Sequence, residues 1–372
     1  MSRVLVLTND FPPRRGGIES FVRSLCDELP PEDVVVYTAA MAGDGRLDAT
    51  LPFPVYRDPG GMLLPTPAVR RRVTAVLTRH GCDRVLVGAA APLGLLAPHL
   101  RRAGACRIVA LTHGHEVWWA RVPVARQLLR RVGREVDVLT YVSEFCGDRI
   151  GAALTAEARS RLVRLSPGVD PSVFFPGCGG DQVRARLGIG SGTPVVVCTA
   201  RLVRRKGQDT LLRAWPEVRR AHPTAVLLVV GDGPARPRLT RLARRLGVQA
   251  SVVFAGGVSW PEVPAHTDAG DVFAMPCRTL WWGLQPEAWG MVVQEATACG
   301  LPVVVGSSGG APEAVVPGSG RVVQGVAEVA DALVSLLGSP RTTDRRSQAG
   351  TLTWSQVGER ARTLLELPDR TT

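Results

Sequence analysis

The feature that most constrains the fold of this chain is a regular alternation of short apolar runs with amphipathic segments. The first runs, at 3–8 and 33–39, are separated by a stretch with the spacing of a helix. Apolar runs of this length without polar alternation are typical of parallel strands buried on both faces. The alternation therefore predicts a doubly wound α/β sheet, with helices joining parallel strands and covering both faces.

The alternation is interrupted once, which predicts two domains. Residues 165–177 contain three Pro and two Gly and lack a helical period, so we interpret them as a linker. A chain of 372 residues is long for a single core. We expect one doubly wound domain over 1–170 and a second over 178–345. The last predicted helix, 353–367, is expected to pack back on the first domain.

One lysine is unusual among the basic residues. The chain contains 45 Lys and Arg, and Lys206 is its only lysine. Lys206 and Arg201 follow the apolar run 194–200, and doubly wound domains bind ligands at the carboxyl ends of their strands. Because guanidinium and ammonium groups suit phosphate oxygens, we expect both residues to bind a diphosphate. A solvated basic loop is the alternative.

Two other segments offer binding sites for anions and hydroxyls. Gly16 and Gly17 open the first predicted helix, where backbone N–H groups and the helix dipole favour an anion, although a plain turn is the alternative. Glu287 and Glu295 flank the start of a helix near Gly290. Glu295 can accept hydrogen bonds from a ribose diol, and Glu287 can hold sugar hydroxyls. The first-turn N–H groups available to a phosphate are those of Met291 and Val292.

Several of these stretches together resemble the retaining glycosyltransferases of family 4, which have the GT-B fold. The similarity covers roughly residues 3–340, and it is most like actinobacterial mannosyltransferases that act on phosphatidylinositol lipids. The stretches that carry it are 9–21, 112–116, 201–207 and 287–304, with support from 166–176 and 230–234.

This resemblance implies two Rossmann-like domains that face each other across a cleft, with the nucleotide-sugar on the second domain and the acceptor on the first. It assigns Val258 to the base and gives His113, Arg201, Lys206 and Glu287 catalytic roles. Val258 would act through its backbone. The full set of implied donor-binding residues is Gly16, Gly17, Arg201, Lys206, Val258, Glu287, Trp289, Gly290, Met291, Val292 and Glu295.

The acceptor side is less defined. His113 ends the run 107–112, where it would lie by the transferred sugar and the acceptor; a hydrogen-bonded structural His is the alternative. Further acceptor-side candidates are Asp10, His115, Trp281 and Trp282. The two tryptophans either stack on a sugar or acceptor ring or are tucked into the core.

Two departures from the family pattern bear on the substrates. Trp281 and Trp282 stand where the lipid mannosyltransferases tend to carry glycines. The family loop E-G-x-G has Ala288 in place of its first Gly, and a Cβ there disfavours positive φ and crowds the sugar. Two hypotheses therefore stay open. The first is mannose transfer from GDP-mannose to an inositol-type lipid. The second is transfer from another UDP- or GDP-sugar to a soluble specialised metabolite.

The sequence contains no D-x-D triplet and no cluster with metal-ligand spacing, so we expect transfer without a metal or other cofactor. Charge on the leaving group would instead be neutralised by Arg201, Lys206 and helix N-termini. The resemblance implies retention by front-face attack, with the leaving phosphate accepting the proton of the acceptor hydroxyl.

A membrane surface is an expected partner. The predicted helix 121–134 carries Arg126, Arg130 and Arg134 four residues apart on one face, with apolar residues between them. This pattern is typical of an interfacial helix, and a solvated face is the alternative. The chain shows no signal peptide and no apolar run long enough to span a bilayer. We therefore expect a cytoplasmic protein, with peripheral binding to the inner face of the plasma membrane.

Two other classes of function are weaker. An isoelectric point of about 10.3 favours nucleic-acid binding, but the chain lacks interleaved aromatics, a recognition-helix pattern and a basic tail. We therefore expect no nucleic-acid partner. A sugar-nucleotide sensor without catalytic activity is indicated only by Ala288.

Overall fold

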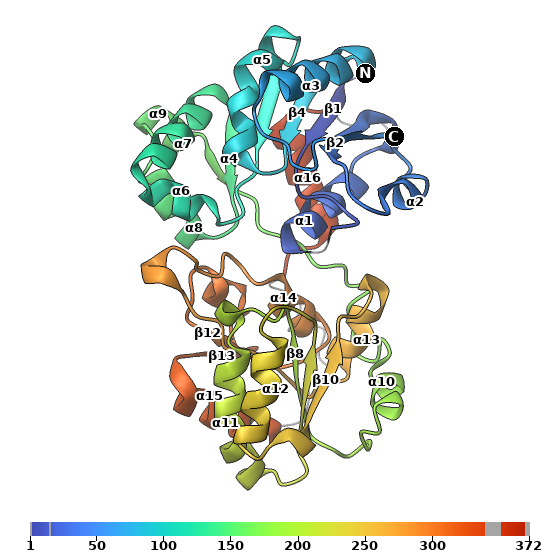
Figure 1. Cartoon of the computed structure of the whole chain (residues 1–372), viewed down its shortest axis with the longest axis vertical. Helices are drawn as coiled ribbons and strands as arrows, with labels where there is room; N and C mark the ends of the chain where they lie inside the picture. Colours follow the sequence, from blue (N-terminus) through green and yellow to red (C-terminus); the bar gives the residue numbers. More distant parts are fainter. Residues whose placement is uncertain (1, 15, 339–350, 369–372) are drawn as a thin grey trace. The chain divides into compact units, whose positions relative to one another are not determined.

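A computed structural model describes residues 2–14, 16–338 and 351–368 (Figure 1). The chain forms two compact units. Unit 1 is Met1–Gly168 with Trp354–Thr372, and unit 2 is Val169–Thr353.

Unit 1 is built on a seven-stranded parallel sheet of order β3-β2-β1-β4-β5-β6-β7. Its strands are β1 (Arg3–Leu7), β2 (Val34–Ala39), β3 (Val55–Asp58), β4 (Cys82–Val87), β5 (Arg107–Ala110), β6 (Val138–Tyr141) and β7 (Leu162–Arg164). Its helices include α1 (Gly17–Asp27), α3 (Pro67–His80), α5 (Ala97–Arg102), α6 (Glu116–Arg121), α7 (Pro123–Glu135), α8 (Glu144–Gly151), α9 (Ala156–Ser160) and α16 (Trp354–Leu365).

Unit 2 is built on a six-stranded parallel sheet of order β10-β9-β8-β11-β12-β13. Its strands are β8 (Val195–Thr199), β9 (Val226–Val230), β10 (Val252–Gly256), β11 (Val272–Met275), β12 (Val303–Gly306) and β13 (Gly320–Val323). Its helices are α10 (Gly180–Arg186), α11 (Gln208–Ala221), α12 (Arg236–Arg245), α13 (Val263–Asp268), α14 (Met291–Ala298) and α15 (Gly325–Leu337). The prediction of two doubly wound parallel sheets is confirmed.

Local sequence signals explain where elements begin and end. In α3 the Thr66 side chain accepts a hydrogen bond from the Val69 N–H, and Pro67 occupies the first turn, where a missing N–H costs nothing. The helix ends at Gly81, whose φ of +61° is the left-handed conformation that glycine adopts without strain.

The last helix, α16, packs on unit 1, as the sequence predicts. It contacts α1, β4 and β5. Arg84 and Arg107 donate hydrogen bonds from Nε to the carbonyls of Leu365 and Leu364, at 2.8 Å and 3.0 Å. These bonds occupy carbonyl groups in the last turn of α16, which have no partner within the helix itself.

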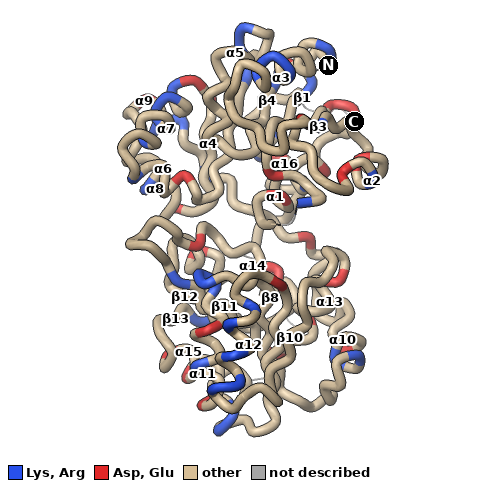
Figure 2. Tube along the Cα trace, in the orientation of Figure 1, with Lys and Arg blue, Asp and Glu red and all other residues tan. Residues whose placement is uncertain are grey.

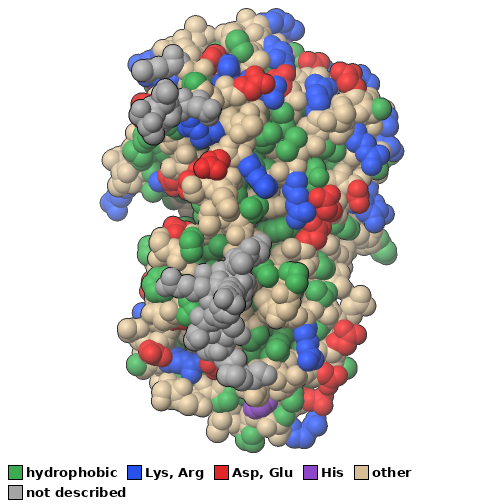
Figure 3. Space-filling view, turned by 180° about the vertical axis from the view of Figure 1, so that it is seen from behind, with side chains coloured by type: hydrophobic (Ala, Val, Ile, Leu, Met, Phe, Trp, Pro, Cys, Tyr) green, Lys and Arg blue, Asp and Glu red, His purple; other side chains and the backbone are tan. Residues whose placement is uncertain are grey.

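Charged residues are spread over both units. Figure 2 shows basic residues recurring along α3, α5 and α7 of unit 1 and along α12 of unit 2. On the face drawn in Figure 3, basic, acidic and apolar side chains are interspersed on each unit. The net charge of +12 is therefore distributed over both units. Within the described ranges, no helix has the length and apolar content needed to cross a bilayer.

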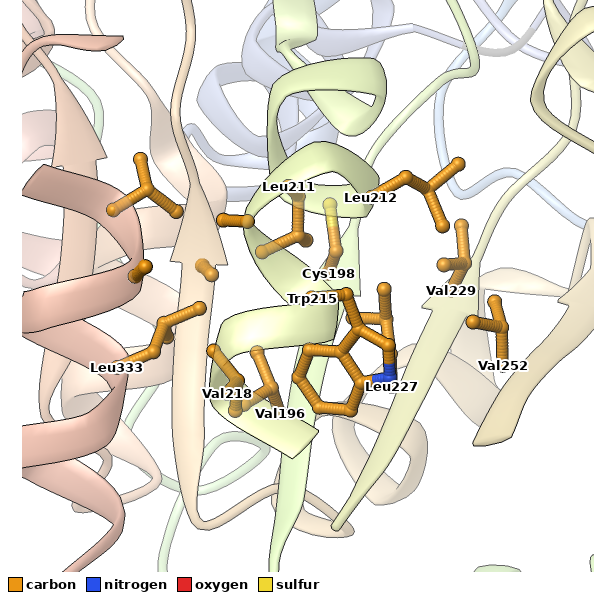
Figure 4. Close-up of a cluster of buried hydrophobic side chains, with 14 of the residues drawn as sticks. Val196, Cys198, Leu211, Leu212, Trp215, Val218, Leu227, Val229, Val252 and Leu333 are labelled. Carbon is orange, nitrogen blue, oxygen red and sulfur yellow. The ribbon is translucent and has the colours of Figure 1, made fainter. Parts of the chain in front are cut away.

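The core of unit 2 fixes the strands that carry the site. Trp215 on α11 is fully buried among side chains that include Val196 of β8 and Leu227 of β9 (Figure 4). Its indole N–H donates to Ser251 Oγ at 3.0 Å, so burial leaves no unpaired donor on this side chain. Burying this aromatic side chain between helix and sheet stabilises the unit by roughly 3 kcal/mol.

Candidate active site

The most distinctive polar groups of unit 2 lie where its strand order reverses. Strands β8 and β11 are neighbours in the sheet, but the chain visits β9 and β10 on one side before it returns to β11 on the other. The carboxyl ends at such a switch point are the usual ligand site of a doubly wound sheet. Lys206 follows β8, and Glu287 follows β11 in the loop before α14.

Lys206 and Glu287 form a largely buried ion pair. Lys206 Nζ lies 2.9 Å from Glu287 Oε2, and the two side chains are 13% and 9% exposed. Arg205 Nε lies 3.8 Å from the same oxygen. Burial opposes ionisation of Glu287, but Lys206 and Arg205 outweigh it and hold its pKa below the ordinary value. Glu287 is therefore a carboxylate at neutral pH.

Backbone geometry explains why a glycine follows the lysine. Gly207 has a φ of +78°, and a Cβ at this position would collide with the carbonyl oxygen of Pro276. Only glycine lets the turn after β8 lie against the end of β11. That contact places Lys206 Nζ 3.6 Å from Met275 Sδ and within reach of Glu287.

A loop after β12 holds the backbone of Glu287. The Glu287 N–H donates to Ser308 Oγ at 3.1 Å, and its carbonyl accepts from Gly310 N–H at 2.9 Å. Gly309 has a φ of +57°, and a Cβ there would meet the Glu287 carbonyl. The carboxylate of Glu287 is thus positioned by two strand ends together.

Helix α14 begins directly behind Glu287. Gly290 precedes it with a φ of +107° and provides no side-chain cap, so the first turn, which includes the N–H groups of Met291 and Val292, has no capping side chain. Half-buried Glu295 lies within the helix. Burial raises the pKa of Glu295 to about 7, and Lys206 opposes this only in part. Glu295 therefore gains or loses its proton near neutral pH.

Other residues of the predicted donor set have different positions. Trp289 is buried, and its indole N–H donates to Gln294 Oε1 at 3.0 Å, so the ring lies against α14. Arg201 is exposed, and its carbonyl accepts from Gln208 Nε2 at 3.2 Å. Val258 is half-buried in the loop after β10, at the same edge of the sheet as Lys206.

Ala288 does not adopt the positive φ that a glycine at this position would allow. In the described chain, the non-glycine residues with positive φ are Trp281, Trp282 and Glu366, so Ala288 adopts a backbone conformation open to any residue. The expectation that a Cβ at position 288 disfavours positive φ is confirmed. Trp281 and Trp282 have φ values of +56° and +51° and are 63% and 93% exposed, which excludes the alternative that they are tucked into the core.

In unit 1, His113 lies at the carboxyl end of β5. Its Nε2 is 2.7 Å from the carbonyl oxygen of Gly88, which only accepts, so Nε2 carries the proton and Nδ1 is the acceptor. The ring packs edge-on against Phe21 at 5.2 Å. Burial lowers the pKa of His113 to about 4, so the imidazole is neutral at pH 7.

Glu116 connects the two histidines. Its carboxylate is fully buried. Oε2 accepts a hydrogen bond from the backbone N–H of His113 at 3.0 Å, and Oε1 lies 3.1 Å from Nε2 of the His115 ring. His115 is exposed. The structure thus brings His113 and His115 together through a carboxylate that contacts both residues.

The first loop of unit 1, which is the predicted anion site, has the carboxylate of Glu19 beside Gly16. A Cβ at Gly16 would collide with the carboxylate of Glu19, so this glycine makes room for an acidic side chain in the first turn of α1. Arg14 lies between Asp10 and Glu19, with nitrogen–oxygen distances of 3.8 Å and 3.2 Å. Gly17 is the first residue of α1.

Sequence reasoning missed three residues: Arg205, Ser308 and Glu116. Each had a signal. Arg205 precedes Lys206 in the same turn, Ser308 follows β12 at the carboxyl edge of the sheet, and Glu116 lies one residue beyond His115. Within residues 2–14, 16–338 and 351–368, no three His, Cys, Asp or Glu side chains are grouped as metal ligands.

The expected interfacial helix is only partly available to a surface. The region forms α6 and α7, and Leu129 and Val132 of α7 are fully buried in unit 1. Arg126 and Arg130 donate to the carbonyls of Ala152 and Ala153, at 3.1 Å and 2.7 Å. The prediction that Leu129 and Val132 face a membrane is wrong, because both side chains are buried within the unit.

Comparison with known proteins identifies relatives over nearly the whole chain. Residues 15–173 match the family described as Glycosyltransferase Family 4, and residues 181–352 match Glycosyl transferases group 1. A protein of Mycolicibacterium smegmatis, named GDP-mannose-dependent alpha-(1-6)-phosphatidylinositol monomannoside mannosyltransferase, is 47% identical over 93% of this chain and 92% of its own length.

A second relative and a solved structure agree with this result. The GDP-mannose-dependent monoacylated alpha-(1-6)-phosphatidylinositol monomannoside mannosyltransferase of Corynebacterium glutamicum is 40% identical over 99% of both chains. The Anabaena protein Alr3699/HepE, solved in complex with UDP, superposes with a TM-score of 0.79 over 98% of this chain and all of that one. At 19% identity, the latter similarity shows the fold alone.

Proposed function

Because this chain belongs to glycosyltransferase family 4 and has the GT-B fold, we propose that it transfers mannose from GDP-mannose to a phosphatidylinositol mannoside lipid. The observation that carries the choice of substrates is the 40–47% identity, over nearly the full chain, to relatives with those substrates in their names. The ion pair at the switch point of unit 2 supports the chemistry, since it places a cation and a carboxylate side by side.

In the proposed reaction, Lys206 and Arg201 bind the diphosphate of the donor. When the donor binds, Lys206 pairs with the diphosphate oxygens in place of Glu287. The carboxylate of Glu287 then accepts hydrogen bonds from the mannose hydroxyls. Cations fixed at the leaving group stabilise the transition state more than the ground state, because charge grows there as the glycosidic bond breaks. Arg205, at 3.8 Å from Glu287, supplies a further positive charge.

The remaining donor contacts are assigned to the edge of the same sheet. The N–H groups of Met291 and Val292 face a phosphate, Glu295 accepts from the ribose hydroxyls, and the Val258 backbone contacts the base. Gly290 leaves the start of α14 open, and Trp289 positions α14 by packing against Gln294. In unit 1, Gly16 and Gly17 are the proposed anion-binding turn.

We assign the acceptor to unit 1, at the carboxyl end of β5. His113 is neutral, and its Nδ1 accepts a hydrogen bond from a hydroxyl of the sugar or the acceptor. A neutral imidazole with the proton fixed on Nε2 orients a hydroxyl without taking its proton. That proton passes to the leaving phosphate. The acceptor attacks the face of the sugar from which the phosphate leaves, so the configuration of the anomeric carbon is retained. Asp10, His115, Trp281 and Trp282 remain acceptor-side candidates.

A lipid acceptor requires the enzyme to reach a membrane, and we propose peripheral binding at its cytoplasmic face. The exposed residues of α6 and α7 that suit this role are Trp118, Val124, Arg131 and Arg134. Burial lowers the pKa of His99, and the positive charges of Arg70, Arg102 and Arg131 lower it further. His99 in turn lines a hollow of about 680 Å³ with Arg70, Arg71 and Arg102. This basic surface suits anionic lipid headgroups.

A thermal-shift panel of nucleotide diphosphates and their sugars tests the donor. We expect stabilisation by GDP and GDP-mannose but not by UDP, and we expect it to disappear in Lys206→Ala. Arg220→Ala, an exposed arginine paired with Glu217, is the control and should respond like the wild type. A shift selective for UDP would reject GDP-mannose and favour transfer from another nucleotide-sugar to a soluble acceptor.

A further inference from the structure

After β11, residues 279–286 form an uncharged loop of unit 2. The loop contains two adjacent tryptophans and two leucines but no Asp, Glu, Lys or Arg, in a chain of which 21% of the residues are charged. Trp281 and Trp282 are 63% and 93% exposed, and both leucines are partly exposed. Single exposed apolar side chains are ordinary, but adjoining ones mark surfaces that contact a partner. The loop is therefore suited to an apolar partner.

Backbone hydrogen bonds hold the two tryptophans at the tip of a hairpin of residues 280–285, the tryptophan hairpin. Leu280 and Gln285 each donate from N–H to the carbonyl of the other at 3.2 Å. Trp281 and Trp282 have φ values of +56° and +51°. This conformation is unfavourable for bulky residues, whereas glycines would form the same turn without strain. Tryptophans kept in it indicate a function of the side chains themselves.

Both ends of the tryptophan hairpin are bound to the proposed donor site. At its start, Thr279 Oγ1 and Ser308 Oγ are hydrogen-bonded at 2.9 Å. At its end, the Glu287 N–H donates to the same Ser308 Oγ at 3.1 Å. The N–H of Arg278, just before the loop, donates to the Arg205 carbonyl at 2.8 Å. The exposed tip therefore belongs to the loop that positions the proposed sugar-binding carboxylate.

The exposed charge beside the tryptophan hairpin is basic. The turn 201–206, which a hydrogen bond joins to the loop, has four basic residues and no acidic one. Arg204 of this turn is exposed. The carboxylates of Asp209 and Glu287 are each paired with a basic side chain. Exposed indoles next to exposed arginines suit an anionic bilayer, since indoles lie at the level of the headgroups and arginines attract anionic lipids.

We propose that the tryptophan hairpin is a membrane anchor, a role that rests on the function proposed above, since only a lipid acceptor requires it. The indoles of Trp281 and Trp282 enter the headgroup region, where the ring is in an apolar environment and the indole N–H still reaches water. The turn 201–206 attracts anionic headgroups. Because the loop ends at Glu287, insertion brings the bilayer surface to the proposed sugar site, and the acceptor reacts without leaving the bilayer.

Quenching of tryptophan fluorescence by brominated lipid tests insertion directly. The wild type is bound to vesicles of equimolar brominated phosphatidylcholine and phosphatidylglycerol, and its emission should be quenched. The double variant Trp281→Gly, Trp282→Gly should lose most of this quenching. Glycine adopts a positive φ without strain, so the variant should fold, with a melting temperature close to that of the wild type. The matched control, Trp260→Ala, removes a 52% exposed tryptophan of unit 2 and should retain the quenching.

Co-sedimentation with the same vesicles measures the contribution of the pair to binding. The double variant should partition at least about tenfold more weakly than the wild type. The difference should persist at high salt, because salt screens charges but does not weaken the burial of indoles. Trp260→Ala should partition like the wild type. Equal partition of the double variant and the wild type at every salt concentration would overturn the proposal.

Two further outcomes would also overturn the anchor. If the double variant keeps its partition but has a higher KM for a water-soluble monomannoside acceptor, the tryptophans bind the acceptor ring. If the wild type is a dimer and the double variant a monomer, with equal partition, the pair is a contact between two copies of the chain. The proposed function fails separately: a wild type that brominated lipid quenches but that transfers no mannose from GDP-mannose would refute the function without removing the anchor.

Discussion

At the scale of single residues, the structure gives the only lysine of the chain a defined task. Lys206 is the main counter-charge of Glu287 and lowers the pKa of this carboxyl group in a place where desolvation disfavours its charge. The sequence predicted that both residues belong to the site, because Lys206 follows an apolar run and Glu287 lies in the loop before a helix. Sequence reasoning missed Arg205, since the side-chain directions within a turn of successive basic residues depend on backbone angles that composition does not reveal.

The ion pair can be tested by separating its effects on stability and on function. Lys206→Met leaves Glu287 buried without its main counter-charge, and we expect the free energy of unfolding to fall by about 3 kcal/mol. Adding Glu287→Gln removes the unpaired charge and should recover most of this loss, but it should not restore nucleotide-sugar turnover. Urea unfolding and turnover assays measure the two effects. A double variant no more stable than Lys206→Met would contradict the assignment.

Glu295 predicts a specific dependence on pH. Its pKa of about 7 lies above the ordinary value of a carboxyl group, so the folded protein holds this proton up to near neutral pH and loses it above. Only the carboxylate accepts two hydrogen bonds from a ribose diol, so affinity for GDP should rise as the pH increases from 6 to 8. Calorimetric titrations in Glu295→Gln should show no such rise. A profile that persists in this variant would assign the titration to another group.

At the scale of elements, the sequence pattern predicts helices, but it does not reveal what covers each helix face or which turn residues have positive φ. The periodicity of 121–134 predicted a helix, but it did not reveal that Leu129 and Val132 pack inside unit 1. An apolar stripe has the same pattern whether a membrane or a protein core covers it. The positive φ angles of Trp281 and Trp282 could not be predicted from the sequence either, because a positive φ is uncommon for a bulky residue such as tryptophan.

The turn after β8 provides a test of backbone geometry. Gly207→Ala introduces a Cβ against the Pro276 carbonyl as well as an unfavourable φ, so it should destabilise the protein by roughly 3 kcal/mol and reduce donor binding. Gly188→Ala is the matched control. Gly188 has a φ of +68° with open space around its Cβ position, so it should cost only about 1 kcal/mol. Similar unfolding free energies for the two variants would show that the close approach to Pro276 is unimportant.

The exposed face of α7 can be separated from its packed face by charge reversal. Arg131→Glu combined with Arg134→Glu should lower co-sedimentation with anionic vesicles at least about tenfold, because each arginine near such a surface contributes about 1 kcal/mol. The charge-matched control reverses Arg238 and Arg241 on α12, both of which are exposed. An equal loss of binding in the control would mean that net charge, rather than this surface, attracts the vesicles.

At the scale of the whole molecule, the sequence predicted the architecture better than the details of the site. Buried parallel strands leave a strong apolar signal, so both sheets could be predicted from the sequence. The polar contact of Ser308 with Glu287 joins residues from different loops. Such pairings depend on how strand ends align, which a single sequence does not encode in any local pattern.

The most direct test of the account is mannosyl transfer itself, measured with GDP-mannose and a purified phosphatidylinositol monomannoside. The wild type should produce an α-linked dimannoside, identified by mass spectrometry and by the coupling constant of the new anomeric carbon. Lys206→Ala should be slower by a factor of at least about 100. Absence of transfer from GDP-mannose by the wild type, or undiminished transfer by Lys206→Ala, would contradict the account.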